Sequence, residues 1–224
     1  EEDGRKGPGH RVRARLNPEI IPSLRSYQEE AVQAALGPKA EGKGLIQLPP
    51  RAGKTIIAAA LTARLGHRTM FVVNSDMLLR QTVKTFKEVI EWQEPIPGGL
   101  PAVGQWGGGE NRPGWVTVAS VQSLVQLFFS PKRGSKRKPI APAKKLQIED
   151  LLGLSGIVFF DECHHLEGEE WRKAMMRCDA YYKFGLSATI YLDQKNGTNK
   201  GAIWLLGATG PRLIQMSASD LIRV

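Results

Sequence analysis

The residue run with the clearest chemical meaning is Pro-Pro-Arg-Ala-Gly-Lys-Thr at positions 49–55, which follows the short apolar run 44–48. A loop between a strand and a helix presents backbone N–H groups, here those of residues 52–55, to phosphate oxygens, and the helix start adds its positive dipole end. In such a loop Lys54 reaches the β- and γ-phosphates and the Thr55 hydroxyl ligates Mg²⁺. The run therefore predicts a site for a magnesium nucleotide.

Leu48 and Arg51 depart from the usual phosphate-loop pattern. The pattern G-x-x-x-x-G-K-S/T places glycine at position 48, where this chain has leucine. A small residue at position 51 would let the loop curl without a side-chain clash. Arginine there either requires a negative φ or projects over the phosphates. We expect Arg51 to add a charge-assisted contact to a nucleotide phosphate or another anion. The alternative is that Arg51 points into solvent.

A second chemical signal is Asp161-Glu162, which ends the apolar run 156–160. In an ATPase with this arrangement, the aspartate holds Mg²⁺ through water and the glutamate orients and deprotonates the attacking water. The alternative is a helix cap or a solvated turn. The nucleotide reading is favoured because the phosphate loop supplies the other half of the same site. Cys163 is expected to be a packing residue, and His164-His165 lack the spacing of a zinc site.

Apolar runs and amphipathic segments alternate along the chain. Strands are predicted at 44–50, 69–74, 116–121, 156–162, 183–190 and 211–217. Helices are predicted at 24–36, 51–66 and 75–92, with a short helical run after residue 121. Strands that are apolar on both faces and alternate with helices indicate an α/β fold, with a mostly parallel central sheet and helices on both faces. Ligands bind beyond the carboxyl ends of such strands, where the polar runs of this chain fall.

Composition excludes several classes of protein. The 224 residues are 42% apolar and 24% charged, which suits a packed core and argues against a wholly disordered chain. No apolar run reaches the roughly 18 residues that a membrane span needs, and the start of the chain does not resemble a signal peptide. The two cysteines are expected to be reduced thiols in a cytoplasmic (nucleoid-associated) or nuclear protein, not a secreted one. No membrane partner is expected.

The net charge of +9 is concentrated in two segments. Residues 131–145 hold seven basic side chains and no acidic one, and residues 1–16 carry a net charge of +2, so the rest of the chain is neutral. We expect a flexible polar N-terminal segment at 1–19 and a flexible basic insertion at about 130–146. The insertion suits contact with a polyanion such as nucleic acid, or it is a solvated loop. The residues that would make the contact are Lys132, Arg133, Lys136, Arg137 and Lys138.

Taken in order, these segments resemble the first RecA-like domain of superfamily 2 helicases, the P-loop NTPases of the DEAD/DEAH-box type. The similarity is greatest to the DNA-repair, phage-recombination and restriction-type branch, and it covers about residues 20–224. The usual glycine of this family at position 51 is arginine here. The matching segments are the adenine-recognising Leu24-Arg25-x-Tyr27-Gln28, motif I at 48–55, motif Ia at 71–81, a turn at Gly107-Gly108, motif Ic at 116–124, the DEAH-like run at 161–165, motif III at 185–189 and the closing strand at 210–213.

The resemblance assigns roles to individual residues. ATP and Mg²⁺ are the implied cofactors, with Lys54, Asp161 and Glu162 as the catalytic residues. The implied nucleotide-binding residues are Arg25, Gln28, Arg51, Ala52, Gly53, Lys54 and Thr55, with Thr55 and Asp161 on the metal. Coupling of the nucleotide site to the nucleic acid is assigned to His164, Ser187 and Thr189. The nucleic-acid backbone would be contacted by Asn74, Ser75, Ser120 and Gln122. For Ser120 and Gln122 the alternative is ordinary turn and helix-start chemistry.

The resemblance also implies partners. Superfamily 2 helicases have a second RecA-like domain that carries arginine fingers, and we expect this domain to be absent from the chain. The isolated first domain would therefore hydrolyse ATP slowly or not at all. The expected function is the motor domain of an ATP-dependent helicase or translocase, with DNA the more favoured nucleic acid. The alternatives are an RNA helicase domain and a non-catalytic nucleic-acid-binding module whose nucleotide site is degenerate, which Arg51 keeps open.

Overall fold

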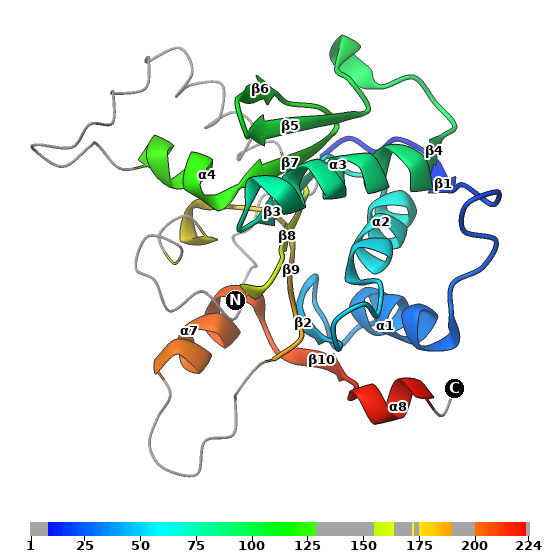
Figure 1. Cartoon of the computed structure of the whole chain (residues 1–224), viewed down its shortest axis with the longest axis vertical. Helices are drawn as coiled ribbons and strands as arrows, with labels where there is room; N and C mark the ends of the chain where they lie inside the picture. Colours follow the sequence, from blue (N-terminus) through cyan, green and yellow to red (C-terminus); the bar gives the residue numbers. More distant parts are fainter. Residues whose placement is uncertain (1–8, 129–154, 164–171, 173–174, 190–199, 223–224) are drawn as a thin grey trace, which may run out of the picture.

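The fold is organised around one large sheet (Figure 1). The computed structural model describes residues 9–128, 155–163, 172, 175–189 and 200–222. Within them, eight strands pair in the order β10-β2-β9-β8-β3-β7-β5-β6, and every pairing is parallel except that of β5 with β6. The strands of this sheet are β2 (Lys43–Gln47), β3 (Thr69–Val73), β5 (Val103–Gly107), β6 (Glu110–Arg112), β7 (Val116–Ser120), β8 (Ile157–Phe160), β9 (Tyr182–Ser187) and β10 (Arg212–Gln215).

Helices cover both faces of the sheet because neighbouring residues of each central strand point to opposite sides. In β3, Phe71 and Val73 belong to one core and Met70 and Val72 to the other. The first core receives α1 (Ser26–Leu36), α2 (Lys54–Leu65) and α3 (Asp76–Val89), and the second receives α4 (Val121–Phe128) and α7 (Lys200–Thr209). A short α8 (Ala218–Ile222) follows β10. This arrangement confirms the predicted α/β class with a mostly parallel sheet.

Aromatic rings join the central strands on the face covered by α1, α2 and α3. The ring of Phe71 in β3 contacts those of Phe159 in β8 and Phe86 in α3, with centroids 5.9 and 5.5 Å apart. Phe159 in turn stacks on Phe184 in β9 at 5.6 Å. All four side chains are fully buried. Such pairs add to the free energy of burial, so this core fixes the spacing of the strands whose ends carry the predicted site.

The N-terminal segment differs from the expectation of a flexible polar tail at 1–19. Residues 1–8 lie outside the described part, but β1 (Ala14–Leu16) pairs antiparallel with β4 (Ile90–Trp92). The guanidinium of Arg15 donates to both carboxylate oxygens of Glu91 at 2.9 and 3.0 Å, and Arg13 pairs with Glu94. Strand pairing and the buried Val12 thus attach the segment to the domain, and the exposed charge pairs add little, so the packed unit begins before residue 20. These arginines have acidic partners and do not form an open basic tail.

The hairpin of β5 and β6 was not predicted, because Gly104 and Gly107 interrupt its short apolar pattern.

Several helices begin or end at other residues than the sequence predicts. The helix expected from residue 51 starts at Lys54, because Arg51 and Gly53 have positive φ values of 64° and 79°. The helix expected to run to residue 92 ends at Val89, where the chain turns into β4. A one-turn 3-10 helix, η1 (Pro97–Gly99), follows β4.

We expect Gly66→Ala to destabilise the domain more than Gly98→Ala. Both glycines have a φ near 70°, which alanine adopts at a cost. At Gly66, however, an added Cβ would lie 2.6 Å from the carbonyl oxygen of Val12, whereas nothing lies within 4 Å at Gly98. Gly66→Ala should lower the free energy of unfolding by about 2–4 kcal/mol and Gly98→Ala by about 1 kcal/mol. Urea denaturation of both variants measures the difference, and equal losses would contradict the close approach of the N-terminal segment.

Candidate functional site

Apart from Arg25 and Gln28, which lie at the start of α1, the predicted site residues that the structure describes lie along the carboxyl edge of the sheet. The phosphate loop follows β2, Ser187 ends β9, and Asp161-Glu162 follow β8, so three strands in the order β2-β9-β8 carry the first group. Asn74-Ser75 follow β3, and Ser120 ends β7, which pairs with β3. The structure therefore brings together the residues that the sequence analysis assigned to one edge. His164 and the basic residues of 131–145 lie outside the described part of the chain.

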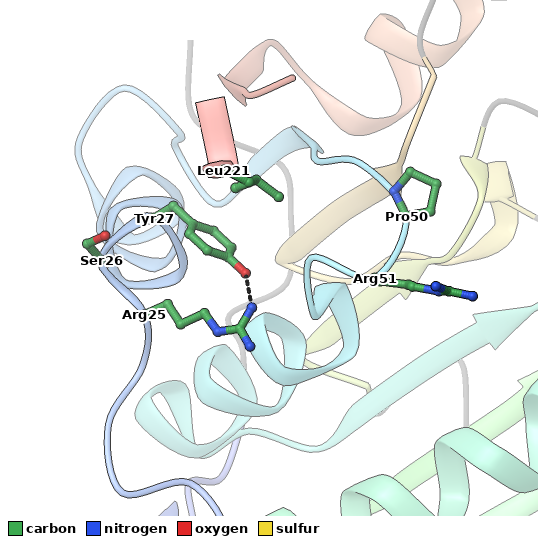
Figure 2. A pocket seen from close by; sticks show the side chains of 6 residues that line it. All are labelled: Arg25, Ser26, Tyr27, Pro50, Arg51 and Leu221. Carbon is green, nitrogen blue, oxygen red and sulfur yellow. Dashed lines mark hydrogen bonds between the residues drawn. The ribbon is translucent and has the colours of Figure 1, made fainter. Parts of the chain in front are cut away.

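The phosphate loop has an unusual backbone. Gly53 precedes the first helical residue, Lys54, with a φ of 79°, and Arg51 has a φ of 64°. Arg51 therefore has the left-handed conformation, which excludes the expected option of a negative φ. An arginine in this conformation carries strain of about 1–3 kcal/mol. Its side chain is exposed and points away from Arg25 and Tyr27 (Figure 2). Ala52 beside it is buried.

Lys54 and Glu162 meet across the strand ends. The Nζ of Lys54 lies 3.6 Å from Oε1 of Glu162 and donates to the carbonyl oxygen of Leu48 at 3.3 Å. The lysine side chain is only 10% exposed and the glutamate side chain 27%. Glu162 also has a positive φ, 48°. Thus an ammonium from the loop after β2 and a carboxylate from the turn after β8 form one partly buried pair, with the end of β9 between the two strands.

Asp161 sits beside this pair in an environment that disfavours its charge. Its pKa is raised to about 6, chiefly by burial and next by the neighbouring charge of Glu162, while Lys54 opposes the shift. Two carboxylates therefore share one ammonium, an arrangement that a divalent cation would neutralise. The Thr55 hydroxyl belongs to the first turn of α2. The donor set fits Mg²⁺, which takes one or two protein oxygens beside substrate phosphates. No cage of three or more His, Cys, Asp or Glu side chains exists among the described residues.

Cys163 is a packing residue, as expected. Its side chain is fully buried in the second core beside Met175 and Leu205. Burial raises the pKa of the Cys163 thiol, and the nearby charges of Asp161 and Glu162 raise it further. The thiolate form is therefore disfavoured, which argues against a nucleophilic role.

Next to the phosphate loop lies a pocket of about 620 Å³, lined by Arg25, Ser26, Tyr27, Pro50, Arg51 and Leu221 (Figure 2). The sequence analysis named Arg25 and Arg51 for this region. It gave no role to Tyr27, although a buried tyrosine hydroxyl needs a hydrogen-bond partner and so is a signal for a specific contact. Leu221 comes from α8, and only the folded structure brings that helix to this site.

The amide of Gln28, which was expected to contact a nucleotide base, has protein partners at both ends. The side chain is buried, its Nε2 donates to the carbonyl oxygen of Ala52 at 3.1 Å, and its Oε1 accepts from the backbone N–H of Arg25 at 3.0 Å. Both ends of the amide thus hold the phosphate loop and the start of α1. A contact between Gln28 and a base remains a prediction.

Ser187 links the end of β9 to the phosphate-loop strand. Its backbone carbonyl accepts from the N–H of Leu48 at 3.0 Å. Its buried hydroxyl donates to the carbonyl of Thr189 at 3.0 Å and accepts from the N–H of the same residue at 3.2 Å. The turn 187–189 is therefore closed by its own serine and joined to β2. This position is compatible with the coupling role expected for Ser187 and Thr189.

The residues predicted to contact nucleic acid form a connected group at the ends of β3 and β7. Ser75 begins α3, its hydroxyl accepting from the N–H of Leu78 at 3.3 Å, and Nε2 of Gln122 donates to the carbonyl of Asn74 at 2.8 Å. Ser120 is 1% exposed, and its hydroxyl lies 2.8 Å from that of Ser123 and accepts the N–H of that residue. The Ser120 side chain therefore serves the start of α4, which was the alternative reading.

Comparison with known proteins shows the family of the chain. The family described as Type III restriction enzyme, res subunit, matches residues 21–192. The chain belongs to this family. Together with the sheet order, this membership confirms the RecA-like domain of a superfamily 2 helicase.

The curated relatives of this chain are longer proteins. The DNA 3'-5' translocase XPB2 of Sulfurisphaera tokodaii is 28% identical over 166 residues, which are 74% of this chain and 30% of that protein. The DNA 3'-5' helicase XPB of Kineococcus radiotolerans is 27% identical over 193 residues, 83% of this chain and 29% of that protein. The chain thus spans about 30% of the length of these relatives.

Solved structures share the fold. The UvsW helicase of bacteriophage T4 matches with a TM-score of 0.54 and 19% identity over 85% of this chain and 59% of that one. The Hef helicase domain of Pyrococcus furiosus matches with a TM-score of 0.57 and 20% identity over 93% of this chain and 42% of that one. Among the described residues of this family member, every helix is too short or too polar to cross a membrane.

We expect Asp161→Asn to stabilise the domain in Mg²⁺-free buffer at pH 8. The folded-state pKa of Asp161, about 6, lies above its ordinary value of 3.8. The folded wild type therefore binds the proton more tightly, and it loses stability as the pH rises through 6. Asparagine does not titrate, so its advantage in unfolding free energy should grow from near zero at pH 4 to about 1–3 kcal/mol at pH 8.

Urea denaturation between pH 4 and pH 8 measures this advantage. Asp179→Asn is the control, because this exposed aspartate is outside the site and its replacement removes a charge without relieving burial. An advantage of Asp161→Asn that is constant over this pH range would contradict the interpretation.

Proposed function

We propose that the chain is the ATP-binding motor domain of a DNA helicase or translocase, which couples ATP hydrolysis to movement along, or unwinding of, nucleic acid. The observation that supports this most is the meeting of Lys54 and Glu162, with Nζ and Oε1 3.6 Å apart, beside the partly buried Asp161. A phosphate-binding lysine, a metal-binding aspartate and a water-orienting glutamate within one partly buried site are the parts that phosphoryl transfer to water requires.

In the proposed reaction the phosphates lie against the N–H groups of residues 53–55 at the start of α2, because the N–H of Ala52 donates to the carbonyl oxygen of Pro49 at 3.3 Å. Lys54 exchanges its partner Glu162 for phosphate oxygens, and the released carboxylate then orients the attacking water and accepts its proton. Thr55 and Asp161 would hold Mg²⁺, which supplies charge neutralisation at the phosphates. The base would enter the pocket beside Arg25. Because Arg51 is exposed at the tip of the loop, we propose that its guanidinium adds a contact to a phosphate.

The nucleic acid would follow the other half of the edge, past the ends of β3 and β7. Asn74, Ser75 and Gln122 are proposed to contact its sugar–phosphate backbone, with backbone N–H groups at the start of α3. Such contacts do not read bases, so we expect little sequence specificity. DNA is favoured over RNA because the curated relatives bear names that specify DNA. The basic side chains of 131–145 would add phosphate contacts.

The proposed function needs a second RecA-like domain. In the resemblance to superfamily 2 helicases that domain supplies the arginine fingers, which contribute orders of magnitude to phosphoryl transfer. We therefore expect the 224-residue chain to bind MgATP but to hydrolyse it slowly. Rapid DNA-stimulated ATP hydrolysis by the chain alone would contradict the need for a second RecA-like domain.

We expect Lys54→Ala and Glu162→Gln to separate binding from hydrolysis. Lys54→Ala removes a direct phosphate contact and should weaken MgATP binding by about tenfold or more, because charged hydrogen bonds contribute about 1.5–3 kcal/mol. Glu162→Gln removes the proton acceptor, and it also frees Lys54 from its carboxylate partner. Binding should therefore persist or tighten, while the residual turnover is lost.

Titration with a fluorescent ATP analogue and single-turnover hydrolysis measure the two effects. Lys84→Ala is the matched control, because Lys84 is an exposed lysine in the middle of α3. If the chain bound DNA but no nucleotide with or without Mg²⁺, the non-catalytic module would replace the motor as the better interpretation.

Replacing residues 131–145 by a short Gly-Ser linker should weaken DNA binding and flatten its dependence on salt. Each phosphate contact adds about 0.9 to the slope of log K against log salt, so losing seven basic side chains lowers the slope by at most about 6. Fluorescence anisotropy with single-stranded DNA, duplex DNA and RNA of matched length, at several salt concentrations, measures the change. An unaltered slope would exclude the segment from the interface.

A further inference from the structure

We propose that Tyr27 is a positioning residue that holds the arginine-containing phosphate loop in its strained conformation. The proposal deepens the nucleotide site of the proposed function and rests on it. It concerns the Ala52 carbonyl and two buried side chains from the first turn of α1.

The brace consists of hydrogen bonds that converge on the Ala52 carbonyl oxygen. The hydroxyl of Tyr27 donates to this oxygen at 3.1 Å, and Nε2 of Gln28 donates to the same oxygen, also at 3.1 Å. Tyr27 and Gln28 are 4% and 7% exposed, so water does not replace these bonds readily. With both bonds made, the carbonyl between Ala52 and Gly53 faces α1. The N–H groups that follow it in the chain remain available for phosphate.

The loop requires such a brace because of Arg51. A residue with a Cβ prefers a negative φ, yet Arg51 has a φ of 64° directly before Ala52. Strained conformations of this kind persist only where the surroundings over-determine them. The fit is close on the other side of Ala52 as well, since a Cβ on Gly53 would lie 2.5 Å from Nε2 of Gln28. A chain with glycine at position 51 would need less support, because glycine adopts positive φ values freely.

Arg25 extends the brace into the pocket. Its Nη1 donates to the Tyr27 hydroxyl at 3.1 Å (Figure 2). The same hydroxyl donates onward to the carbonyl oxygen of Ala52. Arg25 and Tyr27 both line the pocket beside the loop. A group that binds Arg25 in this pocket therefore acts on the hydroxyl that holds the loop. This chain of bonds links the proposed base pocket to the phosphate site through side chains 25 and 27.

The test is a double-mutant cycle between positions 27 and 51. Tyr27→Phe removes the hydroxyl and keeps the ring. It is made in the wild-type chain and in the Arg51→Gly and Arg51→Ala backgrounds. Glycine removes both the charge and the strain of Arg51, whereas alanine removes the charge and keeps the Cβ that causes the strain. Tyr182→Phe is the control for removing a tyrosine hydroxyl, because Tyr182 begins β9, whereas the site lies at the other end of this strand, beside Ser187.

Two readouts are taken for each variant. The first is the affinity for a fluorescent ATP analogue with Mg²⁺. The second is hydrogen–deuterium exchange of peptides covering 50–56 in the ligand-free chain, which needs no nucleotide, with the exchange of β-sheet peptides and thermal unfolding reporting the general integrity of the fold.

Tyr27→Phe should weaken nucleotide binding about fivefold in the wild-type and Arg51→Ala chains and less than about twofold in Arg51→Gly. Exchange in 50–56 should rise in the first two backgrounds and stay nearly unchanged in the third. Equal effects of Tyr27→Phe in all three backgrounds, or none in any, would overturn the proposal while leaving the motor function standing. If the effect of Tyr27→Phe on hydrogen–deuterium exchange depended on residue 51 but no variant bound nucleotide, the role of Tyr27 would be supported and the motor function contradicted.

Discussion

The pairing of the Lys54 ammonium with the Glu162 carboxylate, next to Asp161, is the interaction on which the rest of the site depends. A surface pair of this kind would contribute little, but these groups are mostly buried, so each charge is felt by the others. Burial is the main cause of the raised pKa of Asp161, the charge of Glu162 raises it further, and Lys54 opposes the shift only in part. The site therefore has excess negative charge in the protein alone. A metal ion with a nucleotide would balance it, which gives a physical reason for binding the two together.

Backbone strain occurs on both sides of this interaction. Arg51 in the phosphate loop and Glu162 in the turn after β8 both have positive φ values, 64° and 48°, although neither is glycine. Such residues cost about 1–3 kcal/mol each and cluster where surrounding structure holds them. Around Arg51 the holding groups come from α1, and beneath both turns lies the fully buried core of β2, β8 and β9. Packing that looks remote from the chemistry thus keeps both turns in their high-energy conformations.

Much of the fold could be predicted from the sequence because two-sided apolar runs allow few alternatives to a covered parallel sheet. The same reasoning predicted that the polar residues at 51–55, 161–162 and 187–189, each of which ends such a run, lie at one edge of the sheet, as they do in the structure. The ribbon of β1 and β4 escaped notice, because three-residue strands carry almost no periodic signal and the charge pairs of Arg13 and Arg15 join residues far apart in sequence. Hydrogen-bond direction could not be predicted either. Gln28 has the residue type for base recognition, yet its amide is committed to Ala52 and Arg25.

The place of β9 between β2 and β8 has a metric consequence. Two strand spacings separate the ends that carry Lys54 and Glu162, which amounts to roughly 10 Å of backbone separation. Inter-strand distances in a parallel sheet are fixed by peptide geometry and hardly vary. The distance between the backbone ends of β2 and β8 is therefore fixed by the strand spacing. Only long side chains such as those of Lys54 and Glu162 can meet across it. Replacing Glu162 by aspartate would withdraw the carboxylate by one methylene from a lysine whose Nζ already lies 3.6 Å from Oε1 and is held by the carbonyl oxygen of Leu48.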